Sequence, residues 1–452
     1  MDALTAVRSR LVCAGCGWTA PDPEPYPFRC ARAGMTADDT DHVLTRILDG
    51  HVGFPTDSDP NPFVRYRSLM HAHHLWSASG GRDEDYRRLI EELNSEVARV
   101  DGRGFSATPF FRADLLSDRL GFAAPGGIWV KDETGNVAGS HKARHLTGLL
   151  IHLEMVERLG LTSAADRPPL AIASCGNAAL AAGVVAAAGR RHLIVFVPTD
   201  ADPGIVARLR DLGADVVACE REPGQKGDPT YLRLLRAIGE GALPFTCQGN
   251  LNGLAIEGGT TIAFEIASSL AGSDLSIDHL FVQVGGGALA SACIQGLREA
   301  VSLGVFPGRP RTHTVQTDGA FPLERAYRLV AERLGADRSP DSMERALAYA
   351  ATHRSEFMWP WEKRPESVAT GILDDETYDW LAVVRGTLET RGDGLVVGDD
   401  LILRANALAR DTTGIRVDPT GSAGLAGLMA MIERGAVDPD KRAVVLFTGA
   451  SR

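Results

Sequence analysis

The stretch Leu280-Phe-Val-Gln-Val-Gly-Gly-Gly-Ala288 is a short apolar run that ends in three glycines. Similar runs recur from Thr108 onward, and each is followed by a turn and an Ala- or Leu-rich stretch. The others are Gly127-Ile-Trp-Val-Lys131, His192-Leu-Ile-Val-Phe-Val-Pro198, Asp215-Val-Val-Ala-Cys219 and Val444-Val-Leu-Phe-Thr448. Strands that alternate with helices form parallel sheets covered by helices, with ligand sites at the carboxyl ends of the strands. The pattern therefore predicts an α/β fold, and a chain of 452 residues predicts two lobes with a smaller module.

The bulk composition excludes several classes of partner. The formal net charge is -11, so neither nucleic acid nor an anionic membrane surface is expected as the main ligand. The stretch 170–189 carries no charge, but its Ala, Gly and Ser content predicts a strand, a loop and a helix rather than a membrane span. The seven cysteines are odd in number and residues 1–14 contain no apolar run of signal-peptide length. We therefore expect a cytoplasmic protein.

Lysine is scarce, which makes the search for a reactive amine short. The chain has five: Lys131, Lys142, Lys226, Lys363 and Lys441. The last three lie in charged, loop-like sequence and are expected on the surface. Lys142 lies in Gly139-Ser-His-Lys-Ala-Arg144 and opens a helix with one apolar stripe, for which Ser140 is the expected cap. The positive helix end and the apolar surroundings disfavour a charged amine, and a Schiff base with an aldehyde requires a neutral one. A lysine that merely extends to solvent fits this window equally well.

Three turns at predicted strand ends could hold such a cofactor. In Ala173-Ser-Cys-Gly-Asn-Ala178, Gly176 allows close backbone approach, the amides at the helix start suit a carboxylate, and Asn177 adds a donor for a phenolic oxygen. The three glycines before Ala288 let backbone amides converge on a phosphate, at a spacing that is not the dinucleotide fingerprint. The hydroxyl of Thr448, in Phe447-Thr-Gly449, could meet a pyridine nitrogen and leave it largely unprotonated. Each turn is also compatible with an ordinary α/β protein, but their order and placement together are hard to ascribe to chance.

Taken together, these residues resemble the fold type II pyridoxal-phosphate enzymes, the class of tryptophan synthase β and threonine synthase. The resemblance covers roughly residues 106–452 and includes Thr108-Pro-Phe110, Lys131-Asp-Glu133, Asn136, Gly139, Ser140, Lys142, residues 174–177, Gly285 to Gly287 and Thr448-Gly449. Residues 257–266, the Phe63-Val-Arg-Tyr-Arg-Ser-Leu69 segment and an appendage with Cys13, Cys16 and Cys30 are most similar to threonine synthase. The segment Ser140-His-Lys-Ala-Arg144 differs from the usual Ser-Phe-Lys-Asp-Arg of threonine synthases, so a different substrate is expected.

The resemblance implies a lyase that uses pyridoxal 5'-phosphate and acts on a small amino acid by β- or γ-elimination or replacement. It implies Lys142 as the catalytic residue and a cofactor held by Lys142, Asn177, Gly285, Gly286, Gly287, Ala288 and Thr448. It implies a substrate held by Ser140, His141, Ser174, Cys175, Gly176 and Asn177. His141 is expected to pack on the cofactor ring or face away more often than it assists a leaving group.

Two other functions stay open. One is a serine or threonine dehydratase, an ammonia-lyase of the same fold. The other is a binding or regulatory protein that has kept the pocket and lost turnover, and the retention of Lys142, Asn177 and the three glycines argues against it.

Two groups of metal-ligand residues call for separate interpretation. Cys13, Cys16 and Cys30 form part of a zinc-ribbon pattern, but the fourth cysteine is missing and His42 would have to complete the set. We expect a metal-free remnant and therefore no metal site. His71-Ala-His-His74 has no nearby carboxylate partner, so packed or surface histidines are expected there.

We predict four regions along the chain. Residues 1–34 form the small Cys-containing appendage and residues 35–105 an extension or lid. Residues 106–142 and 252–452 form the large cofactor-binding lobe, and residues 143–251 a small lobe that carries the substrate carboxylate loop. A homodimer is expected.

Overall fold

The larger of two parallel sheets has six strands in the order β11-β10-β9-β12-β4-β3. All neighbours are parallel except β3 and β4, which run antiparallel at one edge. The strands are β3 (Phe110–Arg112), β4 (Gly127–Asp132), β9 (His279–Gln283), β10 (Arg311–Thr317), β11 (Gly394–Val397) and β12 (Arg442–Phe447). In the central register, Val444 of β12 pairs with Leu280 on one side and with Trp129 on the other. The computed structural model describes residues 7–35, 38–222, 227–273 and 275–451.

The smaller sheet has four parallel strands in the order β7-β6-β5-β8. They are β5 (Leu170–Ala173), β6 (Leu193–Pro198), β7 (Asp215–Cys219) and β8 (Leu243–Pro244). A separate antiparallel pair, β1 (Ser9–Cys13) and β2 (Leu44–Leu48), belongs to the amino-terminal region. The expected α/β fold with two parallel sheets is thereby confirmed.

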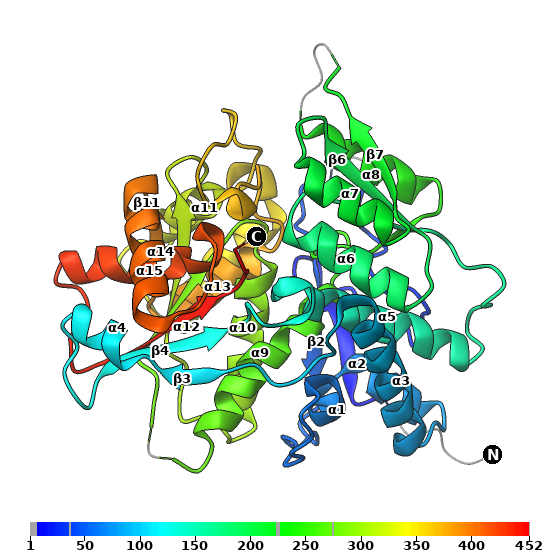
Figure 1. Ribbon diagram of the computed structural model, residues 1–452, viewed down its shortest axis with the longest axis horizontal. Coiled ribbons are helices and arrows are strands. Elements are labelled where there is room, and N and C mark those ends of the chain that lie inside the picture. Colours follow the sequence, from blue (N-terminus) through cyan, green and yellow to red (C-terminus); the bar gives the residue numbers. More distant parts are fainter. Residues whose placement is uncertain (1–6, 36–37, 223–226, 274, 452) are drawn as a thin grey trace.

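Helices cover both faces of each sheet. They are α1 (Pro62–Arg65), α2 (His71–Ala78), α3 (Asp83–Asp101), α4 (Asp114–Arg119), α5 (Lys142–Arg158), α6 (Asn177–Ala188), α7 (Pro203–Asp211), α8 (Pro229–Gly239), α9 (Ala255–Leu270), α10 (Ala288–Ser302), α11 (Pro322–Leu334), α12 (Pro340–Thr352), α13 (Trp380–Glu389), α14 (Asp399–Thr413) and α15 (Pro419–Glu433). Single 3₁₀ turns are η1 (Arg67–Leu69), η2 (Val137–Gly139), η3 (Arg354–Glu356) and η4 (Thr370–Ile372). In Figure 1 the smaller sheet with α7 and α8 lies to one side, α11 to α15 lie to the other, and α1 to α3 lie beneath the smaller sheet.

The core follows the alternation of side chains along the strands. In β9, Leu280 and Val282 face a cluster formed with α9 to α13, whereas Phe281 faces a cluster formed with α4, α14 and α15. Strands of a parallel sheet read as continuous apolar runs because both faces are buried. The smaller sheet repeats this arrangement, with Ile172 facing α5 and α6, and Ala171 facing α8.

Several local predictions can be compared with these elements. The charge-free stretch 170–189 forms β5, a loop and α6, as predicted. Within the described part of the chain, every helix is too short or too polar to cross a bilayer. Lys363 and Lys441 are exposed, as expected. Lys226 and residues 1–6, part of the amino-terminal stretch expected to contain no signal peptide, lie outside the described residues. The predicted division into four regions stays a prediction.

Candidate active site

Lys142 is the first residue of α5, and its side chain is half-buried. The helix runs along the core because Leu146, Leu149 and Leu150 recur at helical spacing and are fully buried. Lys142 therefore projects from the helix end where backbone N–H groups are unpaired. Its expected position in the first turn is confirmed.

The expectation that Ser140 caps this helix is wrong. The N-cap is His141, and no side chain accepts a capping hydrogen bond. Ser140 is extended, with φ -162° and ψ 162°, and it forms an antiparallel bridge with Gly449. Because this bridge holds the backbone extended, the helix begins two residues later. The buried Ser140 hydroxyl then has no hydrogen-bond partner among the described residues.

His141 packs against the turn that follows β12. Its Nδ1 atom lies 3.1 Å from the carbonyl oxygen of Thr448, which can only accept, so Nδ1 carries the hydrogen. The Nε2 atom keeps its lone pair and is buried with no partner in the described structure. Burial lowers the pKa of His141 well below its usual range, and the charge of Lys142 lowers it further. His141 is therefore a neutral imidazole beside Lys142.

The hydroxyl of Thr448 is oriented by a residue that sequence reasoning did not select. Gln283 Nε2 lies 2.7 Å from Thr448 Oγ1 and 2.7 Å from the carbonyl oxygen of Gly421. The contact with the carbonyl requires an N–H donor, so Thr448 Oγ1 accepts from Gln283 and its own hydrogen is free to be donated. The signal in the sequence was a polar residue inside the apolar run of β9.

The loop 174–177 connects β5 to α6 and reaches the same place. Gly176 is the N-cap of α6, so the first amides of this helix point out of the loop. A Cβ atom on Gly449 would lie only 2.7 Å from Asn177 Nδ2. The Asn177 amide therefore lies directly against the turn after β12. Cys175, in the middle of this loop, is exposed to solvent. No hydrogen bond among the described residues joins Cys175 or Ser174 to Lys142.

The glycine loop joins β9 to α10, which begins at Ala288. Gly287 has a φ of +98°, a conformation that favours glycine. A Cβ atom on Gly285 would lie 2.3 Å from Asp374 Oδ2, and one on Gly287 would lie 2.9 Å from Thr377 Cγ2. The glycines are therefore required because another segment of the chain, residues 372–379, lies directly against them.

Segment 372–379 brings a carboxylate to the glycine loop. The Gly286 N–H donates to Asp374, and Thr377 Oγ1 donates to the carbonyl oxygen of Gly285 at 2.9 Å. Loss of hydration raises the pKa of Asp374 to about 6, although Lys142 and the Gly286 amide lower it. An anion thus already accepts a hydrogen bond where the sequence predicted a phosphate. Sequence patterns gave no indication that this segment would lie here.

Asp379 is a second acid in this region. Its side chain is buried, Oδ2 accepts from the Gly249 N–H at 3.3 Å, and Oδ1 has no partner within the described residues. Burial raises the pKa of Asp379 to about 8, against the effects of the Gly249 amide and Lys142. Asp379 therefore keeps its proton at neutral pH.

A buried ionic network fixes the start of α5. Arg144 Nε lies 2.8 Å from Glu133 Oε2, and Arg144 Nη1 lies 2.6 Å from Glu265 Oε1. Lys131 Nζ lies 2.5 Å from Glu265 Oε2. These contacts join β4 and its following turn to α5 and α9. Lys131 and Glu133 thus fix the start of the helix that carries Lys142. The sequence did not identify Arg144 or Glu265 as their ion-pair partners.

The chemistry of these donors fits pyridoxal phosphate. Lys142 supplies an amine, the glycine loop supplies backbone amides of which that of Gly286 already binds a carboxylate, and Thr448 supplies a free hydroxyl hydrogen. Ser140 Oγ and His141 Nε2 are buried polar atoms without partners, as expected of groups that face a ligand. The structure therefore brings together Ser140, His141, Lys142, Asn177, Thr448 and the glycine loop from four separate stretches of sequence.

Two other features lie away from this region. A cavity of about 230 Å³ is lined by residues such as His279, Arg311 and Lys441 at the amino ends of the strands, opposite to where ligands of such sheets bind. His71 and His74 of α2 are packed as expected, with Nδ1 3.0 and 2.8 Å from Ser9 Oγ. The expectation of no nearby carboxylate is wrong for His73, whose Nε2 lies 2.9 Å from Asp83 Oδ1. Neither feature has a role in the chemistry around Lys142.

Comparison with known proteins gives consistent results. Residues 103–449 match the family described as pyridoxal-phosphate dependent enzyme. A threonine synthase of Methanocaldococcus jannaschii is 26% identical over 343 residues, which are 76% of this chain and 74% of that protein. Among solved structures, diaminopropionate ammonia lyase from Escherichia coli has a TM-score of 0.58 at 16% identity, covering 81% of this chain and 89% of that one. Threonine deaminase isoform 2 from Solanum lycopersicum has a TM-score of 0.56 at 18% identity, covering 82% and 86%.

The structural neighbours share the fold, and the family match spans more than three quarters of the chain, including every residue assigned to the site above. The protein is a member of the pyridoxal-phosphate dependent enzyme family.

Proposed function

We propose that this enzyme is a pyridoxal-phosphate lyase that acts at the α-carbon of a small amino acid, by β- or γ-elimination or by replacement. The observation that carries the proposal is the convergence of the Lys142 amine, the amides of the glycine loop and the uncharged hydroxyl of Thr448. The relatives support it, since they are threonine synthases, and the structural neighbours include an ammonia lyase and a threonine deaminase.

The proposed roles in holding the cofactor follow from the donors on each element. Lys142 Nζ would hold the cofactor through its aldehyde group, with release of water, and the amides of residues 285–288 would hold the phosphate. Asn177 Nδ2 would donate to the phenolic oxygen, because it lies against the turn that carries Thr448. When bound, pyridoxal phosphate withdraws electrons from the substrate α-carbon.

Lys142 also has a role as a base. When it is not bonded to the cofactor, the amine of Lys142 would accept the α-proton of the substrate. The amides of loop 174–177 and the Ser174 hydroxyl hold the substrate carboxylate and so orient the α-carbon. The unpaired Nε2 of His141 offers a neutral acceptor beside this amine.

Thr448 determines which reaction is favoured. A neutral hydroxyl that donates to the pyridine nitrogen leaves this nitrogen without a proton. Electron withdrawal from the α-carbon is then weaker, which favours expulsion of a leaving group over transamination. We therefore propose elimination or replacement rather than amino transfer.

The charges around the carboxylate loop bear on the leaving group. Partial loss of hydration raises the pKa of the Cys175 thiol although its side chain reaches the surface, and the carboxylates of Asp200, Asp228 and Asp374 raise it further. Such a field repels a phosphorylated side chain. We propose a leaving group without a phosphate, in agreement with the departures from the threonine synthase pattern around Lys142.

A second candidate is a dehydratase that releases ammonia from serine or threonine. Asp379 favours it, because a hydroxyl needs a proton to leave and this buried carboxyl keeps its proton at neutral pH. Turnover with free serine or threonine, and none with acylated analogues, would support this candidate over replacement chemistry.

The absorbance of the purified enzyme tests the cofactor assignment. We expect a visible band from the bond between Lys142 and the aldehyde, and we expect Lys142→Ala to lose this band and turnover. Lys363→Ala is the matched control, because Lys363 is exposed and should keep both. Colourless wild-type protein that does not respond to added pyridoxal phosphate would overturn the proposal, and so would a band that persists in Lys142→Ala.

Screening of substrates tests the leaving group. Free, acylated, amino-substituted and phosphorylated small amino acids would be compared by the release of keto acid. We expect the phosphorylated compounds to be the poorest. No turnover with any of them, despite bound cofactor, would favour the binding or regulatory function instead.

We also propose that the enzyme is a cytoplasmic homodimer whose partner is its amino-acid substrate, without a nucleic-acid or membrane partner. Large apolar side chains lie exposed on adjoining elements of the large lobe: Phe111 (37%), Leu115 (49%) and Leu403 (47%), on β3, α4 and α14. Exposed apolar side chains on neighbouring elements are typical of a subunit interface. The net charge of -11 supports the absence of a nucleic-acid partner.

A further inference from the structure

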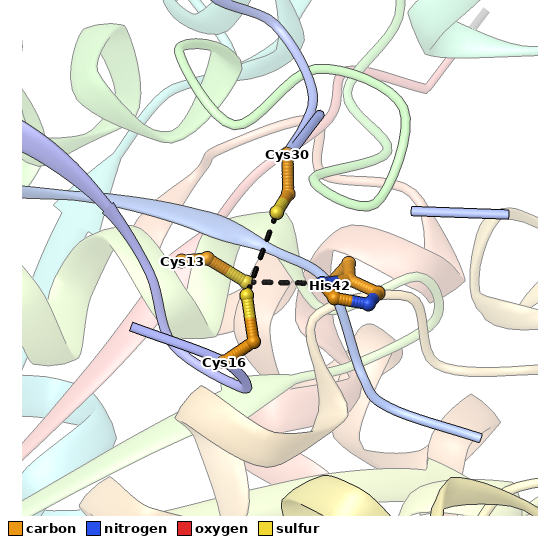
Figure 2. A group of neighbouring side chains, drawn as sticks. All are labelled: Cys13, Cys16, Cys30 and His42. Atoms are coloured by element: carbon orange, nitrogen blue, oxygen red, sulfur yellow. Dashed lines mark hydrogen bonds between the residues drawn. The ribbon is translucent and has the colours of Figure 1, made fainter. Parts of the chain in front are cut away.

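Three cysteines and one histidine of the amino-terminal region converge on one point. Cys13 ends β1, Cys16 lies in the turn that follows, and His42 precedes β2. Cys30 reaches the same point from the segment between them, as Figure 2 shows. The potential ligand atoms of the four residues all lie within 4.8 Å of one another. Within the described ranges of the chain, no other such group of three or more residues is found.

The distances between these atoms match the edges of a zinc tetrahedron. Cys16 Sγ lies 3.6 Å from Cys30 Sγ, and Cys13 Sγ lies 3.3 Å from His42 Nδ1. Bond lengths of about 2.3 Å to sulfur and about 2.0 Å to nitrogen give tetrahedral edges of about 3.8 Å and about 3.5 Å. Four ligands at this spacing enclose a single ion and leave no open position, which is the arrangement of a structural site.

The backbone supports the same arrangement. Gly17 has a φ of +71°, and its N–H donates to the carbonyl oxygen of Cys13 at 2.9 Å, so a tight turn holds Cys13 and Cys16 side by side. A Cβ atom on Gly15 would lie 2.3 Å from the carbonyl oxygen of Asp41. Glycine at this position therefore lets the segment that carries His42 approach the turn.

Asp38 fixes the orientation of His42. Its Oδ2 atom lies 2.5 Å from His42 Nε2, so Nε2 carries the hydrogen and Nδ1 presents its lone pair toward Cys13. A carboxylate that accepts from the outer nitrogen is the usual companion of a histidine that binds a metal. A disulfide between Cys16 and Cys30 would leave Cys13 and the oriented His42 without a function.

The segment that carries His42 is attached to the large lobe. The Asp41 N–H donates to the carbonyl oxygen of Ala351 at 2.8 Å, and Trp380 Nε1 donates to Asp41 Oδ1 at 3.0 Å. Trp380 is buried and is the first residue of α13, directly after Asp379 at the glycine loop. A metal that holds His42 therefore also holds Asp41 beneath the start of this helix.

We propose that Cys13, Cys16, Cys30 and His42 bind one structural zinc ion, which fastens the amino-terminal region to α13 of the large lobe. This reverses the sequence-based expectation of a metal-free remnant, because the missing fourth cysteine is replaced by a histidine twelve residues after Cys30 in the chain. The proposal does not depend on the reaction that the enzyme catalyses.

Metal analysis of the full-length enzyme tests the ligand set. We expect about one zinc ion per chain in wild type and loss of zinc in His42→Ala, as four protein ligands define a closed site. His51→Ala, a change of an exposed histidine in the turn after β2, should keep the ion. His42→Cys should also keep it, which separates loss of a ligand from a general failure to fold.

A second measurement tests what the ion does. Chelator-treated wild type should unfold at a lower temperature and bind pyridoxal phosphate more weakly, and zinc chloride alone should restore both. Zinc that persists in His42→Ala would overturn the proposal. So would metal-free wild-type protein with a disulfide between Cys16 and Cys30, iron in place of zinc, or a chelated protein whose unfolding temperature is unchanged.

Discussion

Single residues set the charge around the glycine loop. Asp374 accepts a hydrogen bond from the Gly286 amide, in the loop proposed to hold the cofactor phosphate. One amide cannot serve both anions fully, so an ionised Asp374 opposes the phosphate. Its pKa of about 6 means that the carboxyl is largely ionised at neutral pH and neutral in mild acid.

The pH dependence of stability should therefore change in Asp374→Asn. The pKa of Asp374 is about 6 in the folded chain, against 3.8 for an aspartate in the unfolded chain. Between pH 3.8 and about 6 the folded state therefore binds more protons than the unfolded state. The free energy of unfolding therefore falls as the pH rises from about 4 to about 6, by up to about 3 kcal/mol. Partial exposure of the carboxylate makes the fall smaller than this upper value. Asp374→Asn should remove this loss, as measured by urea unfolding of cofactor-free protein.

The control is Asp411→Asn, because Asp411 is exposed and its replacement should give a curve parallel to that of wild type. Cofactor titration gives an independent readout, in which Asp374→Asn should bind pyridoxal phosphate more tightly than wild type above pH 6. If Asp374→Asn were instead more stable than wild type by an amount that grows toward acid pH, the raised pKa assigned to Asp374 would be wrong.

Gly287→Ala should damage both stability and cofactor binding. The added Cβ atom would lie 2.9 Å from Thr377 Cγ2 at a φ of +98°, which predicts a loss of about 1–3 kcal/mol. Gly239→Ala is the matched change, because the space around Gly239 at the end of α8 is open. It should be neutral or stabilising by up to about 1 kcal/mol. Equal effects in the two variants, measured by chemical unfolding, would refute this explanation.

At the level of elements, the network around Arg144 sets the position of α5 and hence of Lys142. It joins the turn after β4 to α5 and α9 through side chains that are almost wholly buried. A buried charge that loses its partner is costly, so the network restricts these elements to one arrangement. The geometry at Lys142 thus depends on residues that do not contact the cofactor.

Arg144→Met tests this dependence. The change leaves Glu133 without its closest cation and Glu265 with Lys131 alone, and we expect a loss of about 3–5 kcal/mol in the free energy of unfolding. Arg434→Met removes an exposed arginine and should change the same quantity by less than about 0.5 kcal/mol. Urea denaturation with added cofactor measures both. Similar losses in the two variants would show that the network contributes little.

At the level of the whole molecule, two sheets and the amino-terminal region meet around the site. The carboxyl ends of β9 and β12 belong to one sheet and that of β5 to the other. The amino-terminal region is attached to α9 and α10 through buried Arg46, which pairs with Glu257 and Glu299. The site therefore forms only when both sheets are folded together. The exposed apolar side chains on β3, α4 and α14 are where we propose that a second subunit binds.

Light scattering should show a dimer for wild type and a monomer for the combined variant Phe111→Ser, Leu115→Ser, Leu403→Ser. All three side chains are exposed in the single chain, so their loss should leave folding intact. Met35→Ser changes a more exposed apolar residue, at 63%, outside this surface and should leave the dimer unchanged. A monomeric wild type would contradict the proposal.

The amino-acid sequence by itself determined the elements and the chemical parts of the site. Apolar runs, glycine turns and helical periodicity are local properties, so the strands, the first-turn position of Lys142 and the glycine loop could all be predicted. The resemblance to a known class added the expected use of pyridoxal phosphate, and the family match agrees with it.

Only the tertiary structure decided which distant residues meet. Three contacts join segments that are far apart in sequence. Gln283 pairs with Thr448, Asp374 lies against the glycine loop, and His42 converges with three cysteines. The bridge between Ser140 and Gly449 even overrode a local capping signal. Local patterns record what each segment can form alone, whereas these contacts depend on how the segments pack together, and only the folded chain specifies that packing.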